Sequence, residues 1–172
     1  MKTENYIIRE AQIADAEELV AYVKHLSEEP DLDIALGPGE FNLSTYEEEM
    51  ILTEYAISDN SIFLVAEAEG KIVGALNCKG GVRKATRHSV ILGISIFQDW
   101  RGRGIGDALM AEAIEWARGT GIVKRIELSV YARNERAIHL YEKHGFEVEG
   151  RRKRSVCRKG EYEDDLIMAL IL

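Results

Sequence analysis

The stretch from residue 88 to residue 109 constrains the fold more than any other part of the sequence. It begins with the run VILGISIF, which is apolar on both faces, as a strand in the centre of a sheet requires. The turn RGRGIG follows within a few residues, and after it apolar side chains recur at helical spacing. A buried strand, a glycine-rich turn and an amphipathic helix therefore follow one another, which predicts a domain of helices packed on a sheet.

The rest of the chain extends this pattern without internal repeats or linkers. A first helix follows Asp15, which is placed as its N-cap, and a second covers Thr45 to Ile57. The order predicts a single α+β domain over residues 1–172, with one mixed, mostly antiparallel sheet of about seven strands and about four helices. The other elements are expected at 6–9, 61–68, 71–78, 88–97, 125–131, 146–156 and 162–170 (strands) and at 104–118 and 135–144 (helices).

Composition excludes several classes of protein. Of the 172 residues, 46% are apolar, which suits a buried core, yet no apolar run is long enough for a membrane span or a signal peptide. The net charge of −8 argues against a large nucleic-acid surface. The two cysteines, Cys78 and Cys157, and the four histidines show no metal-ligand spacing, so no metal is expected. We therefore expect a cytoplasmic protein that binds neither membranes nor nucleic acids.

The charges are unevenly distributed along the chain. Residues 1–60 carry 15 acidic and 3 basic side chains, whereas residues 61–172 carry 15 acidic and 19 basic ones. One interpretation is that the first part attracts a cation and the second an anion. The other is an ordinary solvated surface on which charges of one sign cluster.

The glycine-rich turn has the features of an anion site. Gly102, Gly104 and Gly106 allow a sharp turn and a close approach to backbone amides, and the helix that follows starts with unpaired N–H groups. Arg101 and Arg103 are expected to supply mobile cations at the rim. Together these parts suit a pyrophosphate.

Several interpretations of this turn compete. A Walker loop needs Gly-Lys-Ser/Thr, and a dinucleotide fingerprint needs G-x-G-x-x-G in a parallel βαβ unit; neither pattern is present. This disfavours a nicotinamide or flavin oxidoreductase. A coenzyme A loop, written Gln/Arg-x-x-Gly-x-Gly/Ala, fits from Arg101 to Gly106 position by position. A tight strand-to-helix connection without a ligand is the remaining alternative.

A second motif follows the strand at 125–131. The segment from residue 134 to residue 146 matches N-x-x-A-x-x-x-Y-x-x-x-G-F, with Asn134, Ala137, Tyr141, Gly145 and Phe146 at the specified positions. With the turn before it, this segment resembles the GCN5-related N-acetyltransferase superfamily over residues 88–146. The resemblance implies an α/β/α sandwich of the acyl-CoA N-acyltransferase type.

The resemblance also implies a reaction and a cofactor site. An acetyl group would pass from acetyl-CoA to a primary amine by direct attack in a ternary complex. The pantetheine arm would run along Ile94, Ser95 and Ile96, between strands that splay apart. Asn134, Ala137 and Tyr141 would contact the cofactor on the other side. The pyrophosphate would lie on the amides of Arg101, Gly102, Arg103, Gly104, Ile105 and Gly106.

Three groups are candidates for the chemistry. Tyr141 is the candidate acid, because a phenol with a pKa of about 10 can hydrogen-bond a leaving thiolate; alternatively it is a core tyrosine. A backbone N–H at Ile96 or its neighbour would stabilise the oxyanion. Some relatives use a glutamate as base at the position of Ser129, so Ser129 and Glu127 are candidates through a water chain; both could instead be ordinary strand polar residues.

In the family, the first two helices, their loop and the final hairpin usually border the acceptor. We therefore expect a cationic amine there: a polyamine, an amino-acid-like molecule or a protein N-terminus. The rival hypothesis is a module that binds coenzyme A without catalysis. Relatives often dimerise, so a homodimer is left open. The acidic candidates beside the acceptor are Glu28, Glu29, Asp31, Asp33 and Glu40.

Overall fold

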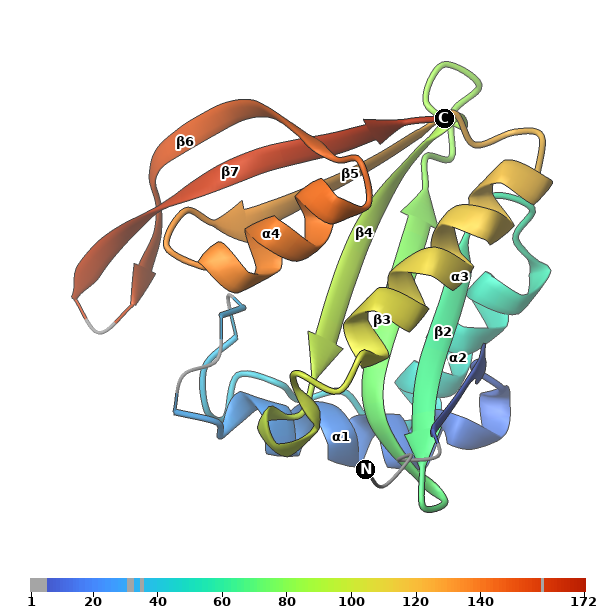
Figure 1. The fold of residues 1–172 in the computed structure, drawn as a ribbon. Coiled ribbons are helices and arrows are strands. Elements are labelled where there is room, and N and C mark those ends of the chain that lie inside the picture. Colours follow the sequence, from blue (N-terminus) through green and yellow to red (C-terminus); the bar gives the residue numbers. More distant parts are fainter. Residues whose placement is uncertain (1–5, 31–32, 35, 159) are drawn as a thin grey trace.

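The computed structural model describes residues 6–30, 33–34, 36–158 and 160–172 (Figure 1). The order of helices and strands predicted from the sequence is confirmed, with bounds that differ by a few residues at most. The elements are β1 (Tyr6–Glu10), a 3-10 turn (Ile13–Asp15), α1 (Ala16–Ser27), α2 (Thr45–Ile57), β2 (Ile62–Ala68), β3 (Lys71–Gly80), β4 (Ser89–Ile96), a second 3-10 turn (Gln98–Trp100), α3 (Ile105–Gly119), β5 (Arg125–Tyr131), α4 (Glu135–Lys143), β6 (Glu147–Arg158) and β7 (Glu161–Ile171).

The seven strands form one mixed sheet in the order β1-β2-β3-β4-β5-β7-β6. All neighbours are antiparallel except β4 and β5, which are parallel. Those two pair only where Ser89–Ile91 meets Arg125–Glu127, and beyond that point they diverge, as Figure 1 shows. The predicted splay between these strands is therefore present, and it opens the sheet near its centre.

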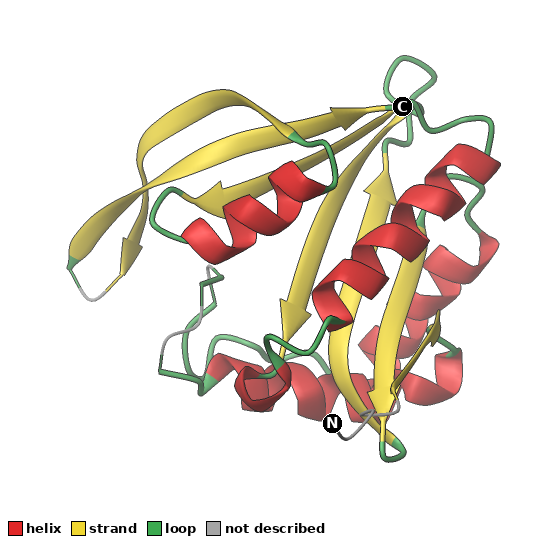
Figure 2. Cartoon of the chain, in the orientation of Figure 1, coloured by secondary structure: helices red, strands yellow, loops and turns green. Residues whose placement is uncertain are grey.

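Helices cover both faces of the sheet, which gives the expected α/β/α sandwich (Figure 2). Side chains alternate between the faces along each strand, so neighbouring residues of β2 belong to different cores. Leu64 packs with α3 residues such as Leu109, whereas Val65 packs with Leu19 and Leu52 of α1 and α2. No helix among the described residues is long and apolar enough to cross a membrane.

Candidate active site

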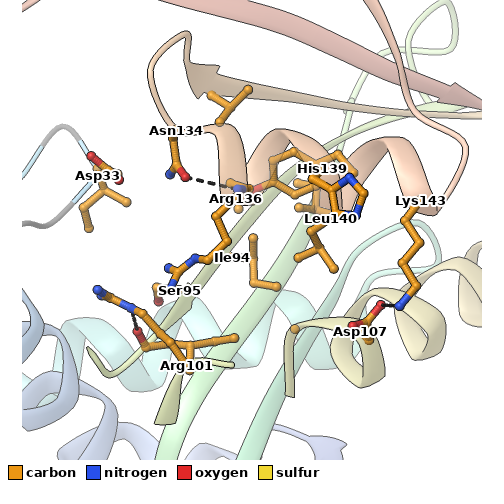
Figure 3. A pocket seen from close by; sticks show the side chains of 18 of the residues that line it. Asp33, Ile94, Ser95, Arg101, Asp107, Asn134, Arg136, His139, Leu140 and Lys143 are labelled. Carbon is orange, nitrogen blue, oxygen red and sulfur yellow. Dashed lines mark hydrogen bonds and ion pairs between the residues drawn. The ribbon is translucent and has the colours of Figure 1, made fainter. Parts of the chain in front are cut away.

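A cavity of about 440 Å³ lies where β4 and β5 part (Figure 3). Its walls come from the second half of β4, the glycine-rich turn, α4, the end of β5 and the loop after α1. The structure brings most of the predicted site residues to this cavity. Those that line it are Ile94, Ser95, Ile96, Arg101, Gly102, Gly104, Gly106, Ser129, Asn134, Ala137 and Tyr141.

The glycine-rich turn takes the conformation that its sequence requires. Gly102 (φ +77°) and Gly104 (φ +84°) are left-handed, and Gly104 is the N-cap of α3. A Cβ at Gly106 would lie 3.1 Å from Leu140 Cδ2 of α4, so the Leu140 side chain would have to move by a few tenths of an ångström to admit it. Gly104, Gly106 and Asp107 all line the cavity. The N-terminus of α3, with its partial positive charge and unpaired amides, therefore meets the cavity wall.

Arg101 is anchored rather than mobile, which differs from the expectation. Its Nε donates to the Ile96 carbonyl at 2.8 Å, and its guanidinium pairs with Glu29, the residue two positions after α1. Glu29 also accepts from the Gln98 amide at 2.8 Å. One carboxylate thus ties the end of α1 to the turn that follows β4, and this acid is not free for an acceptor amine.

Two other residues of the turn lie off the cavity wall. The guanidinium of Arg103 stacks on Trp100, 4.7 Å from the ring centroid, and the Ile105 side chain is buried in the core. The resemblance assigns only the backbone amides of Arg103 and Ile105 to the pyrophosphate. Their side chains instead contact Trp100 and the core.

Helix α4 forms the opposite wall. The Asn134 side-chain oxygen accepts from the Ala137 amide at 3.1 Å, which caps the helix, and Asn134 also lines the cavity. Tyr141 is only 6% exposed and packs against Phe146, so it belongs both to the core and to the cavity wall. Burial raises the pKa of its phenol to about 12. The phenol therefore stays protonated throughout the neutral range, as a hydrogen-bond donor must.

The same helix adds three basic residues to the cavity wall. Arg136, His139 and Lys143 line the cavity, and their i, i+3, i+7 spacing places them on one face of α4 (Figure 3). Lys143 Nζ donates to Asp107 at 2.6 Å, and this bond lowers the pKa of Asp107. Their helical spacing is the feature by which the sequence could have revealed this cluster. The three side chains add positive charge opposite the N-terminus of α3.

The two candidate bases, Glu127 and Ser129, both lie on β5, but at different places relative to the cavity. The Ser129 hydroxyl lines the cavity and accepts from Arg152 at 2.9 Å. Glu127 lies where β4 and β5 are still paired, away from the cavity wall, and its carboxylate accepts from Arg125 at 2.7 Å. The structure thus brings Ser129 to the site and leaves Glu127 outside it.

The acidic segment contributes less than expected. Of the four candidates that the structure describes, Asp33 alone lines the cavity, and it forms a 2.8 Å ion pair with Arg133. Glu40 accepts from the Gly37 amide and Glu28 lies on the surface, while Asp31 lies outside the described residues. Glu29, Asp33 and Glu40 are therefore each bound to another residue within the fold.

Tyr22 of α1 is a further residue that the sequence did not indicate. It is 3% exposed, and its hydroxyl lies 3.0 Å from the Ser95 hydroxyl at the cavity wall. Cys78 is buried, which raises the pKa of its thiol to about 12 and makes it a poor nucleophile. Within the described ranges, no three His, Cys, Asp or Glu side chains gather as metal ligands.

The fold agrees with that of known acetyltransferases, and the sequence is similar to theirs. The "L-amino acid N-acetyltransferase AaaT" of Escherichia coli is 41% identical over 108 residues, which are 63% of this chain and 67% of the relative. A GNAT-family acetyltransferase structure from Streptococcus pneumoniae is 40% identical, with a TM-score of 0.94 over 98% of this chain and all of that one.

A ribosomal-protein-alanine N-acetyltransferase from Brucella melitensis is 32% identical, with a TM-score of 0.83 over 96% of this chain and 99% of that one. More distant structures share the fold, among them a phosphinothricin acetyltransferase from Sinorhizobium meliloti in complex with acetyl-CoA (22% identity, TM-score 0.84, covering 97% of this chain and 88% of that one). The profile of the acetyltransferase (GNAT) family matches residues 18–146. The resemblance seen in the sequence is confirmed, and the chain belongs to the acetyltransferase (GNAT) family.

Proposed function

We propose that this chain transfers the acetyl group of acetyl-CoA to a primary amine inside the cavity between β4 and β5. The observation that carries the proposal is the opening of the sheet directly beside the N-terminus of α3. That arrangement offers an extended thioester arm a strand edge to lie along, and offers its diphosphate a helix N-terminus. Family membership and the acetyl-CoA in the Sinorhizobium meliloti structure support the same donor.

The cofactor would be held from three sides. The pantetheine arm would pair with the main chain of Ile94, Ser95 and Ile96 on the side of β4 that faces the gap. The diphosphate would lie on amides of the turn from Arg101 to Gly106. Arg136 and Lys143 of α4 would add cations at the rim. The Arg101 guanidinium would shape the turn through its bonds to Ile96 and Glu29.

The reaction needs a neutral amine. A free alkyl ammonium has a pKa of about 10.4, so it must lose a proton before it attacks. The nitrogen then forms a bond to the thioester carbon, and the C–S bond breaks as the tetrahedral intermediate collapses. The second amine proton leaves, and coenzyme A departs as a thiol. In sum, an ammonium and acetyl-CoA give an N-acetyl amide, coenzyme A and one proton.

Residues at the gap would support these steps. A backbone N–H near Ile96 would stabilise the oxyanion, and the Tyr141 hydroxyl would donate to the leaving sulfur. The first proton would leave through water beside Ser129, which lines the cavity. Because Glu127 bonds Arg125 outside the cavity, Ser129 is the better-placed end of that water path.

The acceptor in this proposal is an α-amine. A relative and a structural neighbour are named for acetylating L-amino acids and a ribosomal-protein alanine, both of which present that group. The test is to mix the purified protein with acetyl-CoA and a panel of amines, and to follow thiol release and product mass. Amine-dependent thiol release with a matching N-acetyl product is expected. Coenzyme A binding without such release would favour the non-catalytic module.

The single-domain organisation, a cytoplasmic location and homodimerisation stay predictions of the sequence.

A further inference from the structure

Helix α2 carries an apolar stripe along one side. Tyr46, Met50 and Ile57 are 69%, 51% and 81% exposed, and Thr53 lies between them on the same line. At 100° per residue, these four positions fall within about 60° of one another around the helix. We call this group of four residues the α2 stripe. Soluble chains seldom leave an ordered row of large apolar side chains in water unless another surface covers it.

The opposite side of α2 already makes the contacts that the fold needs. Leu52 is buried with residues of α1 and β2, and the Tyr55 hydroxyl accepts from Asn77 of β3 at 2.7 Å. Figure 1 shows α2 on the other side of the sheet from α3. Among the residues that the structure describes, no element covers the α2 stripe. It therefore serves no packing purpose within one chain.

The spacing of the stripe is typical of paired helices. Its steps of four, three and four residues are those of the a and d positions along which two helices share a seam. The Thr53 hydroxyl donates to the Glu49 carbonyl at 2.7 Å, so it needs no polar partner across such a seam.

The same steps are obtained in either direction along the helix. A second α2 that runs antiparallel would therefore set Tyr46 against Ile57 and Met50 against Thr53. A surface that complements itself in this way suits a pair of identical chains related by a two-fold axis.

The charges beside the stripe favour the antiparallel direction. Glu47 and Glu54 lie on one flank, where Lys79 of β3 donates to Glu54 at 2.8 Å, and Glu49 lies on the other flank. Equal flanks meet in an antiparallel pair, so Glu47 of a second copy would come next to Lys79 and Glu54. A parallel pair would set Glu49 against Glu54 and would align the two helix dipoles.

A lipid surface fits the stripe poorly. Helices that lie on membranes carry Lys and Arg on their polar sides, whereas α2 contains four glutamates and no basic residue. We propose that the α2 stripe is an interface between two copies of this chain, with the two α2 helices antiparallel. None of its four residues lines the cavity, so the inference does not rest on the proposed acetyl transfer.

The first test is sedimentation equilibrium of the full chain between about 1 and 200 µM, which should show a reversible monomer–dimer equilibrium. Ile57→Glu places a charge in the seam and should raise the Kd of the dimer at least about tenfold. Ile171→Glu is the matched control, because Ile171 is 66% exposed on β7; its Kd should stay within about twofold of the wild type. If near-UV circular dichroism shows that Ile57→Glu is misfolded, Met50→Glu carries the test.

A chain that stays monomeric over this range would overturn the proposal. So would a dimer that Ile171→Glu dissociates and Ile57→Glu does not, since the interface would then lie on the sheet.

The direction of the helices is tested with cysteines. Tyr46→Cys and Ile57→Cys are made separately in a Cys157→Ser background, because Cys157 is exposed. The two variants are then mixed, oxidised and analysed by intact mass. The antiparallel pair predicts a disulfide that joins one variant to the other. Disulfides that join each variant mainly to itself would contradict it.

The flank charges give an independent readout. Lys79→Glu would bring three carboxylates together in the antiparallel pair, so it should raise the Kd about two- to tenfold. Lys124→Glu, at an exposed position after α3, is the control and should leave the Kd within about twofold. An unchanged Kd for Lys79→Glu, or an equal rise for both variants, would contradict the proposed arrangement.

Discussion

Replacing Tyr141 by phenylalanine removes a single hydroxyl from the wall of the proposed reaction site. The aromatic ring, which packs against Phe146 at a centroid distance of 6.0 Å, is kept. The melting temperature should therefore change by no more than about 3 °C, which corresponds to about 1 kcal/mol in a chain of this size. Any larger effect on turnover then reports on the hydroxyl and not on packing.

The size of that effect follows from the burial of the phenol. Burial raises the pKa of Tyr141 to about 12, whereas a thiol has a pKa of about 8.5. This difference in pKa opposes complete proton transfer from the phenol to the thiolate. The hydroxyl therefore acts mainly as a hydrogen-bond donor to the developing charge, which is worth about 1.5–3 kcal/mol. Tyr141→Phe should lower kcat by about 10- to 150-fold.

The assay is thiol release under saturating amine, with coenzyme A affinity measured separately by calorimetry. The affinity and the KM for acetyl-CoA should change by less than about threefold, because the lost bond forms as the thiolate leaves. The control is Tyr162→Phe, at an exposed position in the β6–β7 hairpin, which should leave kcat unchanged. In the wild type, no limb of the pH–rate profile between about pH 6 and 10 should belong to Tyr141, since the phenol stays protonated. An unchanged kcat, or a loss confined to coenzyme A affinity, would refute the reasoning.

Three other substitutions test the supporting structure. Glu29→Gln breaks the ion pair with Arg101, so it should lower the unfolding free energy by about 1–3 kcal/mol and weaken coenzyme A binding. Denaturant titration measures the stability, and calorimetry measures the coenzyme A affinity. Wild-type stability together with wild-type affinity would contradict the anchoring role of Glu29. Gly106→Ala places a Cβ against α4 and should lower coenzyme A affinity several-fold, whereas Gly119→Ala, whose Cβ meets nothing within 4 Å, should not. The pKa of Asp15 is lowered, first because its carboxylate accepts a hydrogen bond from an arginine of β1. The carboxylate therefore stabilises the fold at neutral pH, and this contribution is lost as the pH falls below about 4. The deficit of Asp15→Asn in unfolding free energy should shrink over the same pH range, and a deficit that does not depend on pH would contradict this role.

The sequence predicted the elements well because local signals mark them. Alternating apolar residues mark β5, whose bounds Arg125–Tyr131 were predicted from the sequence, and α2 begins after Ser44 in a capping box with Glu47. Strand β3 runs to Gly80 rather than stopping at Cys78. Its last residues are defined by pairing with β4, which is a long-range property. Register and strand order depend on such pairings, and the position of β7 between β5 and β6 was not predicted.

The candidate site was predictable where a motif fixes the backbone, and less so where distant side chains meet. The glycine-rich turn and the start of α4 have sequence signatures, so their place on the cavity wall could be expected. The partnership of Arg101 with Glu29 joins residues 72 positions apart, and that of Tyr22 with Ser95 spans 73. No local pattern encodes such contacts. The expectation that Arg101 is mobile failed for this reason.

The most direct measurement for the whole account is a crystal structure of the protein with coenzyme A. The diphosphate should lie within hydrogen-bond distance of backbone amides between Arg101 and Gly106. The pantetheine arm should lie beside Ile94–Ile96, and the sulfur should lie near the Tyr141 hydroxyl. A coenzyme A molecule bound elsewhere on the protein, with the gap between β4 and β5 unfilled, would contradict it.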